Sequence, residues 1–114
     1  MTNVHEILAQ RRQAALQRRD RRVEELYRRH PGPAKLREER LQKGRALLGQ
    51  AMRMSERERE RAQEAMHKLL AEEKEAWNAL GVSSDAFEPH FTCSDCEDTG
   101  FVDGVSCHCR NALL

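Results

Sequence analysis

Four cysteines near the C-terminal end have the spacing of a metal site. They form a C-x2-C pair and, ten residues later, a C-x-C pair: Cys93, Cys96, Cys107 and Cys109. A C-x2-C pair brings two sulfurs to one ion across a tight turn, and four thiolates leave no open position for a catalytic water. The pattern therefore predicts one structural zinc ion (Zn2+) bound by all four cysteines.

The choice between a metal and disulfides depends on the cellular compartment. The sequence has no uncharged apolar run of the roughly 18 residues that a membrane span needs. Residues 1–6 also lack the basic start and apolar run of a signal peptide. We therefore expect a cytoplasmic protein without membrane association. In the reducing cytoplasm, closely spaced cysteines are more often metal ligands than disulfides.

Other states of the cysteines stay open at this point. They include reduced thiols packed as small core residues, a disulfide, and an iron–sulfur cluster, which also takes four cysteines. His90 or His108 is an alternative ligand in place of one cysteine. We expect the C-x-C pair to lie on a strand, where alternation points positions 107 and 109 to one side and His108 away from them. That alternation favours the four-cysteine set.

Helical patterns dominate the sequence before these cysteines. Residues 3–30 contain neither Gly nor Pro and show apolar positions at i, i+3 and i+4 spacing, up to the Pro-Gly-Pro at 31–33. A second helix follows, and Ser55 with Glu58 has the form of a capping box, which favours a break there over one continuous helix from 34 to 80. The last stripe, around residues 62–80, ends at Gly81, a residue suited to a left-handed helix end.

We therefore expect a mainly α fold, with a long helical hairpin or three-helix bundle over residues 1–81 and a small cysteine knob over 82–114. Asp103-Gly104 favours a type I′ turn, which predicts a β-hairpin over residues 101–106 within the knob.

Charge is distributed unevenly along the chain. Residues 1–33 carry eight Arg and four acidic residues, residues 34–81 are net +2, and residues 82–114 are net −5. The five histidines are scattered, and no spacing suggests a Ser/His/Asp or Cys/His catalytic arrangement. We expect a non-catalytic protein with a basic helical part and an acidic knob.

The segment around the cysteines resembles a known family. Phe91 precedes the C-x2-C pair, Asp98-Thr99-Gly100-Phe101 follows it, and Gly104 and the C-x-C pair complete the motif. This pattern is similar to the N-terminal domain of bacterial replicative helicase loaders of the DnaI/DnaC type. The resemblance is sharp over about twenty residues and loose elsewhere. It implies a zinc-binding domain that grips the hexameric replicative DNA helicase, with an AAA+ ATPase domain that is absent from this sequence.

Two functions compete at this stage. The first is a docking module of a DNA replication helicase loader, with Tyr27 and Trp77 as candidate contact residues or, equally, as core residues. The second is a zinc protein that binds single-stranded DNA through the arginines of the first helix. Those arginines occur all around the helix and aromatic residues for base stacking are scarce, so DNA contact is the weaker alternative.

Overall fold

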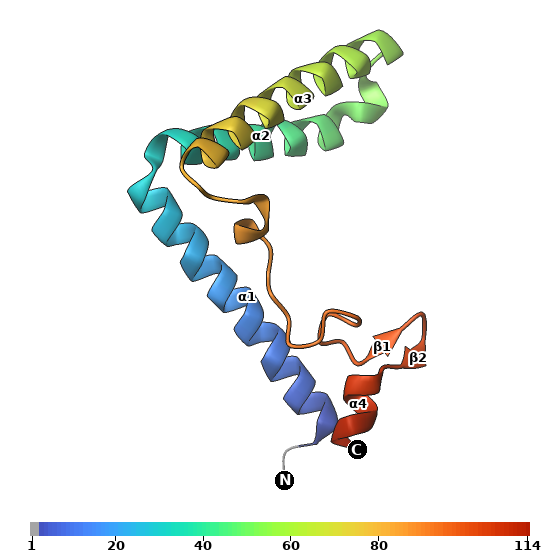
Figure 1. The fold of residues 1–114 in the computed structure, drawn as a ribbon. Coiled ribbons are helices and arrows are strands. Elements are labelled where there is room, and N and C mark those ends of the chain that lie inside the picture. Colours follow the sequence, from blue (N-terminus) through green and yellow to red (C-terminus); the bar gives the residue numbers. More distant parts are fainter. Residues whose placement is uncertain (1–2) are drawn as a thin grey trace. The chain divides into compact units, whose positions relative to one another are not determined.

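The computed structural model describes residues 3–114, and it is mainly helical (Figure 1). Three long helices come first: α1 (Val4–Arg29), α2 (Pro31–Gln50) and α3 (Glu56–Ala79). Short elements complete the chain: 3-10 helices η1 (Ala51–Arg53) and η2 (Ser84–Phe87), strands β1 (Phe101–Val102) and β2 (Val105–Ser106), and α4 (His108–Leu113). The expected mainly α fold with a cysteine-bearing β-hairpin is confirmed. Within residues 3–114, no helix has the length and apolar character that crossing a membrane requires.

The chain divides into two compact units. One, here the knob unit, joins the N-terminal part through Glu24 to Asp85–Leu114, and the other, here the hairpin unit, is Glu25–Ser84. This grouping differs from the sequence-based division into 1–81 and 82–114, because most of α1 belongs with the cysteine-bearing segment. The physical reason lies in the side chains that α1 directs at that segment.

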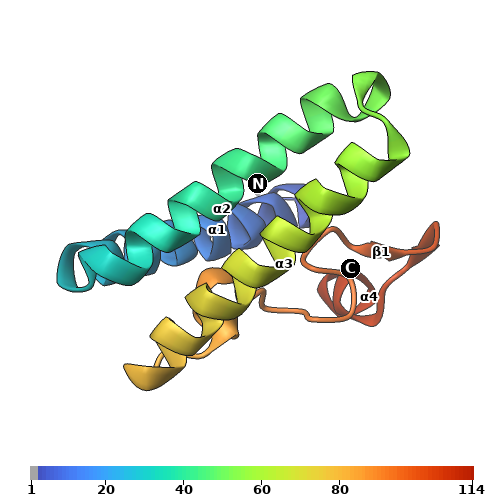
Figure 2. The ribbon, with the colours of Figure 1, turned by 90° about the horizontal axis from the view of Figure 1, so that it is seen from above.

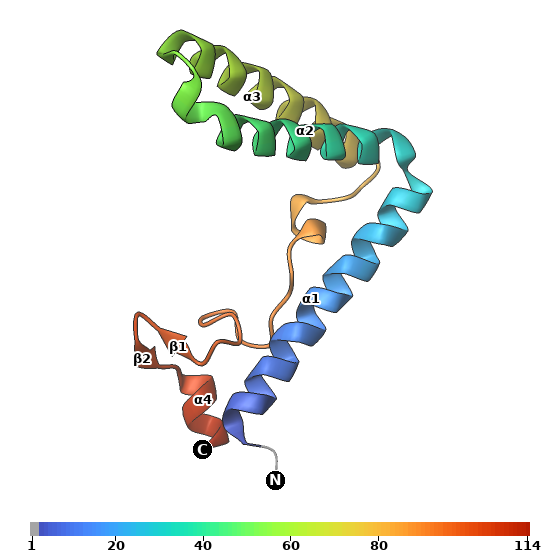
Figure 3. The same ribbon diagram turned by 180° about the vertical axis from the view of Figure 1, so that it is seen from behind.

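In the knob unit, arginines of α1 hold the segment that leads to the cysteines. Arg22 donates hydrogen bonds to the carbonyls of Ala86 and Glu88, each at 2.8 Å. Arg12 donates to the carbonyl of Glu97 at 2.9 Å. The Ala86 carbonyl belongs to the short helix η2, and those of Glu88 and Glu97 belong to the irregular stretch that follows it beside α1 (Figure 3). The guanidinium groups therefore replace the partners that a sheet or helix normally supplies to backbone carbonyls.

The hairpin unit is built on α2 and α3, which pack side by side (Figure 2). Of the two expected forms, the structure shows the helical hairpin. The chain breaks at Ser55, whose side chain accepts a hydrogen bond from the Glu58 N–H at the start of α3. The other end of α3 is followed by Gly81 at φ 77°, the left-handed conformation expected there. Both helix boundaries therefore follow from local chemistry.

Aromatic residues of the hairpin unit are used internally. Trp77 is buried, and the His30 ring meets it edge-on with ring centroids 6.3 Å apart. The Tyr27 hydroxyl donates to the Glu38 carboxylate at 2.6 Å and accepts from Arg37 at 2.6 Å. Trp77 is thus a core residue, and the hypothesis that it contacts a partner is not supported by its position. Burial, followed by the Glu38 carboxylate, raises the pKa of Tyr27.

An acidic residue occupies the core side of α3. Glu73 is 4% exposed and forms an ion pair with Arg40 of α2. The pair explains why a charged residue stands where the helical stripe calls for an apolar one. A buried carboxylate without its partner is costly, so the two residues act as one unit across the helix interface.

We predict that Arg40→Met lowers the free energy of unfolding of the hairpin unit by about 3 kcal/mol, because it leaves the Glu73 carboxylate buried without its partner. The double variant Arg40→Met/Glu73→Leu should recover most of that loss, since two apolar side chains pack without desolvating a charge. Urea unfolding followed by helical circular dichroism measures both.

Lys43→Ala is the matched control. It removes the exposed pair with Glu39, whose N–O distance is 3.5 Å, and should change stability by less than about 1 kcal/mol. Equal losses in Arg40→Met and Lys43→Ala would contradict the assigned role of the Glu73 pair.

Candidate metal centre

The first two cysteines lie at the ends of a tight turn. Glu97 and Asp98, directly after the C-x2-C pair, have φ values of 55° and 60°, and Gly100 has φ 89°. The backbone N–H of Thr99 and its hydroxyl both donate to the carbonyl of Cys96, at 3.1 and 2.7 Å. The left-handed residues therefore bend the chain sharply after Cys96, and the Thr99 contacts with the Cys96 carbonyl hold this bend.

Asp98 stabilises this turn from within. Its side chain is 1% exposed, and its two carboxylate oxygens accept hydrogen bonds from the backbone N–H groups of Thr92 and Cys93, at 2.9 and 2.8 Å. Hydrogen bonds to a carboxylate are stronger than neutral ones. The conformation around Cys93 is therefore set by a charged acceptor. Asp98 belongs to the sequence motif, but its residue type and position in a loop do not predict this role.

The second cysteine pair follows the β-hairpin. Strand β1 pairs with β2 in antiparallel register, Phe101 with Ser106 and Val102 with Val105. Asp103 and Gly104 have φ values of 51° and 78°, as a type I′ turn requires, so the expected hairpin is confirmed. It returns the chain to Gly100, whose carbonyl accepts from the Cys107 N–H at 2.8 Å.

One expectation about this pair is wrong. The C-x-C segment is not a strand, because Cys107 caps the N-terminus of α4 and Cys109 lies in that helix's first turn. The two sulfurs converge through the bend from cap into helix, whereas strand alternation was expected to align them. His108 is consequently not directed away from the cluster.

The four cysteine sulfurs gather at one point. All lie within 4.8 Å of one another. The Sγ atoms of Cys93 and Cys107 are 3.8 Å apart, and those of Cys96 and Cys109 are 3.4 Å apart. Four sulfurs bound at about 2.3 Å to one tetrahedral ion are separated by about 3.8 Å. A disulfide needs about 2.05 Å, and all four cysteines are free. The cluster is compatible with one structural metal ion.

The thiols influence one another strongly. Burial alone raises the pKa of Cys96, but hydrogen bonds from the Gly100 N–H and from neighbouring thiols, Cys109 first, lower it to about 7. Burial and the Cys96 thiol raise the pKa of Cys109 to about 12. Deprotonation of one thiol therefore makes deprotonation of its neighbour less favourable. A bound metal cation compensates for this, because it binds the cysteines as thiolates.

The two histidines considered as alternative ligands differ in position. His90 lies outside the sulfur cluster, with Nε2 3.0 Å from the carbonyl of Asp85. His108 lies beside the cluster, with Nε2 2.7 Å from the Asp95 carboxylate and 3.9 Å from the Cys93 sulfur. All four cysteines have the mutual geometry of ligands, so neither histidine is needed to complete a set of four.

Helix α1 approaches the centre at Gly100. A Cβ atom at this position would lie 2.8 Å from Cδ1 of Leu8, a buried residue of α1. The missing side chain therefore allows α1 to pack directly on the chain between the two cysteine pairs. The positive φ of Gly100 adds a second reason for glycine there.

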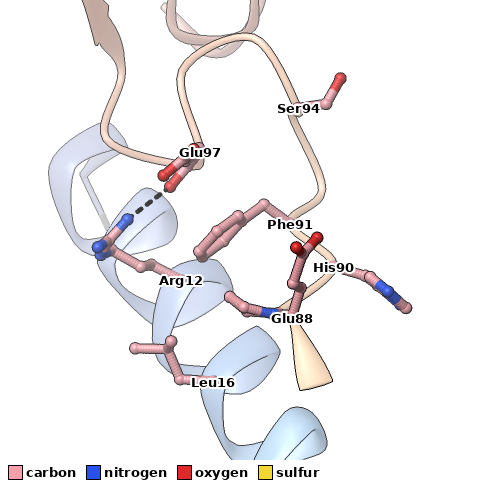
Figure 4. Close-up of a pocket in the computed structure, with 8 residues that line it drawn as sticks. Arg12, Leu16, Glu88, His90, Phe91, Ser94 and Glu97 are labelled. Carbon is pink, nitrogen blue, oxygen red and sulfur yellow. Dashed lines mark hydrogen bonds between the residues drawn. The ribbon is translucent and has the colours of Figure 1, made fainter. Parts of the chain in front are cut away.

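A cleft of about 680 Å³ lies between α1 and the chain before the first cysteine. It is lined by Arg12, Leu16, residues 88–91, Ser94 and Glu97. The Arg12 guanidinium lies 5.2 Å from the centre of the Phe91 ring and reaches the Glu97 carbonyl (Figure 4). The aromatic residue of the motif thus serves to anchor the cysteine turn to α1.

Comparisons with known proteins identify no relative. No family model matches the chain, and neither the curated proteins nor the solved structures contain a match.

We predict that Asp98→Asn weakens metal binding about 10- to 100-fold, as loss of a supporting contact around a metal ligand typically does. The amide cannot accept from both Thr92 and Cys93, so the turn loses its charged acceptor. Competition with a chromogenic chelator measures the affinity.

Glu88→Gln is the control, because it makes the same change of charge at an exposed position of the same segment. A loss of affinity equal to that of Asp98→Asn would show that net charge, rather than the two amide contacts, is responsible.

Proposed function

We propose that the four cysteines bind a zinc ion and that the ion holds the knob unit together. Zinc favours four thiolates in tetrahedral geometry. Three of the four cysteines are buried, and their cluster contains no apolar residue other than cysteine. So small a core provides little hydrophobic stabilisation, and metal binding supplies folding free energy instead.

Zinc removal should destabilise the cysteine-bearing segment of the knob unit while the long helices stay folded. We expect residues 91–110 to exchange their amide hydrogens much faster after chelation, because Cys93 and Cys107 are then no longer tied together. The signal of the long helices in circular dichroism should stay nearly unchanged, since α2 and α3 pack without the metal. Hydrogen exchange read by mass spectrometry, with metal analysis of the same sample, tests this.

The Cys107→Ser variant serves as a second measurement. Full zinc occupancy in it would contradict the four-cysteine assignment, and iron in place of zinc in the purified protein would contradict the choice of metal.

We further propose that the protein is a non-catalytic docking module of a helicase loader, which contacts a hexameric replicative DNA helicase. The observation that carries this proposal is an apolar surface at the connected end of the α2–α3 hairpin. Leu48 is 83% exposed and Met52 is 97% exposed. An exposed apolar patch of this kind is typical of an interaction site.

This surface has the form of a groove for a partner helix. A groove of about 400 Å³ is lined by Arg40, Leu41, Gly44, Arg45, Leu47, Leu48 and Met66. Gly44 leaves room for Met66, because a Cβ there would lie 3.3 Å from the Met66 Cε atom. Methionine adapts readily to a docked apolar side chain. We call these residues, with Met52, the tip groove.

The charges around the tip groove indicate the kind of helix that it accepts. Residues 41–66, which include both sides of this end of the hairpin, contain six Lys or Arg and four Glu, a net charge of +2. An amphipathic helix with an apolar stripe and acidic flanks complements such a surface. We propose that the helicase presents a helix of this type.

Binding of single-stranded DNA is less well supported. Arg12, Arg18 and Arg22 donate to backbone carbonyls of the knob unit. Arg28 and Arg29 pair with Glu25. Much of the basic character of α1 is therefore used within the protein, which reduces the number of arginines available to phosphates.

The test of docking uses the zinc-loaded protein and the replicative helicase of the same organism. Wild type should form a complex in gel filtration, and Leu48→Glu/Met52→Glu should weaken it roughly tenfold or more, since charged groups enter an apolar contact. Val105→Glu, at an exposed apolar position of the knob unit, is the control and should bind like wild type.

The experiment tests the partner and the contact surface separately. No complex with wild type would reject the helicase as partner. A complex that tolerates both glutamates would retain the partner and reject the tip groove as the contact surface.

A further inference from the structure

A second group of metal-ligand atoms lies directly beside the four-sulfur centre. The Cys93 thiol, the Asp95 carboxylate and the His108 imidazole each offer one atom, and these three atoms lie within 4.8 Å of one another. His108 Nε2 is 2.7 Å from Asp95 Oδ2 and 3.9 Å from Cys93 Sγ. The group shares Cys93 with the first centre and otherwise consists of residues that the four-cysteine set does not use.

We propose that this group binds a second zinc ion, with the Cys93 thiolate bridging the two ions. The inference rests on the first ion proposed above. Asp95 and His108 complete a set of three protein ligands, and a water molecule occupies the fourth position. Sulfur, nitrogen and oxygen are all ligands that zinc accepts.

The distances are compatible with such an ion. Around a tetrahedral zinc, a nitrogen and an oxygen bound at about 2.0 Å lie about 3.3 Å apart, and a nitrogen and a sulfur lie about 3.5 Å apart. The N–O distance in the structure, 2.7 Å, is shorter than this value, and the N–S distance, 3.9 Å, is longer. Both side chains are exposed, so small rotations bring them to the required separations.

The local backbone places these ligands on one side of the centre. Asp95 lies inside the C-x2-C turn, and His108 is the middle residue of the C-x-C segment. Because Cys107 caps α4, His108 starts that helix and reaches back to the first cysteine. The departure from a strand at this point is therefore what brings the imidazole to Cys93.

Charge favours a second cation here. Four thiolates around one Zn²⁺ carry a net charge of about −2, because the ligands bind deprotonated. The knob unit as a whole is also acidic, with seven Arg against nine acidic residues, and Asp95, Glu97 and Asp98 lie within or directly after the C-x2-C pair. An additional divalent ion reduces the repulsion between the thiolates and the nearby Asp95 carboxylate.

The competing explanation is that His108 Nε2 forms a hydrogen bond with the Asp95 carboxylate and merely lies near the Cys93 sulfur, with no ion between them. This arrangement contains one bound metal ion per chain, whereas the proposal requires two. Counting the ions therefore distinguishes the two explanations.

The experiment measures zinc per chain by mass spectrometry of the elements, after equilibration of the whole protein with micromolar free zinc. Wild type should hold two ions, and Asp95→Asn and His108→Ala should each hold one. His67→Ala, which removes an exposed histidine of α3, is the matched control for zinc bound at unrelated histidines and should still hold two.

Cobalt substitution verifies that the first centre stays intact. The thiolate-to-cobalt charge-transfer absorption of the four-sulfur centre should be unchanged in Asp95→Asn and His108→Ala. The second equivalent of cobalt should add visible bands of a mixed sulfur, nitrogen and oxygen site in wild type and in His67→Ala alone.

One zinc ion in wild type, or two in both Asp95→Asn and His108→Ala, overturns this inference and leaves the first zinc site standing. No bound zinc in wild type overturns both metal proposals, and neither result bears on helicase binding.

Discussion

Four sulfur atoms from two short segments must reach one point, and the geometry of the knob unit follows from this requirement. The first segment meets it with left-handed residues after Cys96 and with the Asp98 carboxylate, which accepts the Thr92 and Cys93 amides. The second meets it with a two-residue turn and a helix cap. These local features fix the backbone of a segment that contains only two-residue strands and one short helix. The sulfurs in turn replace the apolar core that so short a segment cannot form.

The same requirement explains the use of α1. The irregular chain around the four sulfurs leaves carbonyls without partners in regular structure, and guanidinium groups satisfy several of them at once because each has five N–H donors. Arg22 alone serves two carbonyls. The sequence suggests that α1 is a basic surface helix, but several of its arginines bind backbone carbonyls within the protein. This changes the meaning of the charge asymmetry, since the basic helix and the acidic segment belong largely to one unit.

The features that the sequence predicts well are local. The Ser55 cap, the left-handed Gly81 and the Asp103-Gly104 turn each depend on a few neighbouring residues, and each occurs as expected. Cysteine spacing likewise predicts that four sulfurs gather. The C-x-C conformation and the membership of α1 in the knob unit were not predicted. The membership of α1 depends on contacts between residues far apart in the chain, such as Arg12 with Glu97, which no periodicity reveals. The C-x-C conformation is local, but a helix of six residues is too short to show an apolar periodicity. The role of Asp98 was missed because an acidic residue in a loop gives no signal of burial.

The order of the two units along the chain has a consequence for folding. The hairpin unit is continuous from Glu25 to Ser84, so its contacts are local and form quickly. The knob unit needs side chains from α1 to meet carbonyls that lie 64 to 85 positions later. During synthesis, α1 therefore leaves the ribosome long before the segment it must hold has been made. The arginine contacts and the sulfur cluster can close only once residues 85–114 have emerged, which makes the knob unit the later of the two units to become ordered.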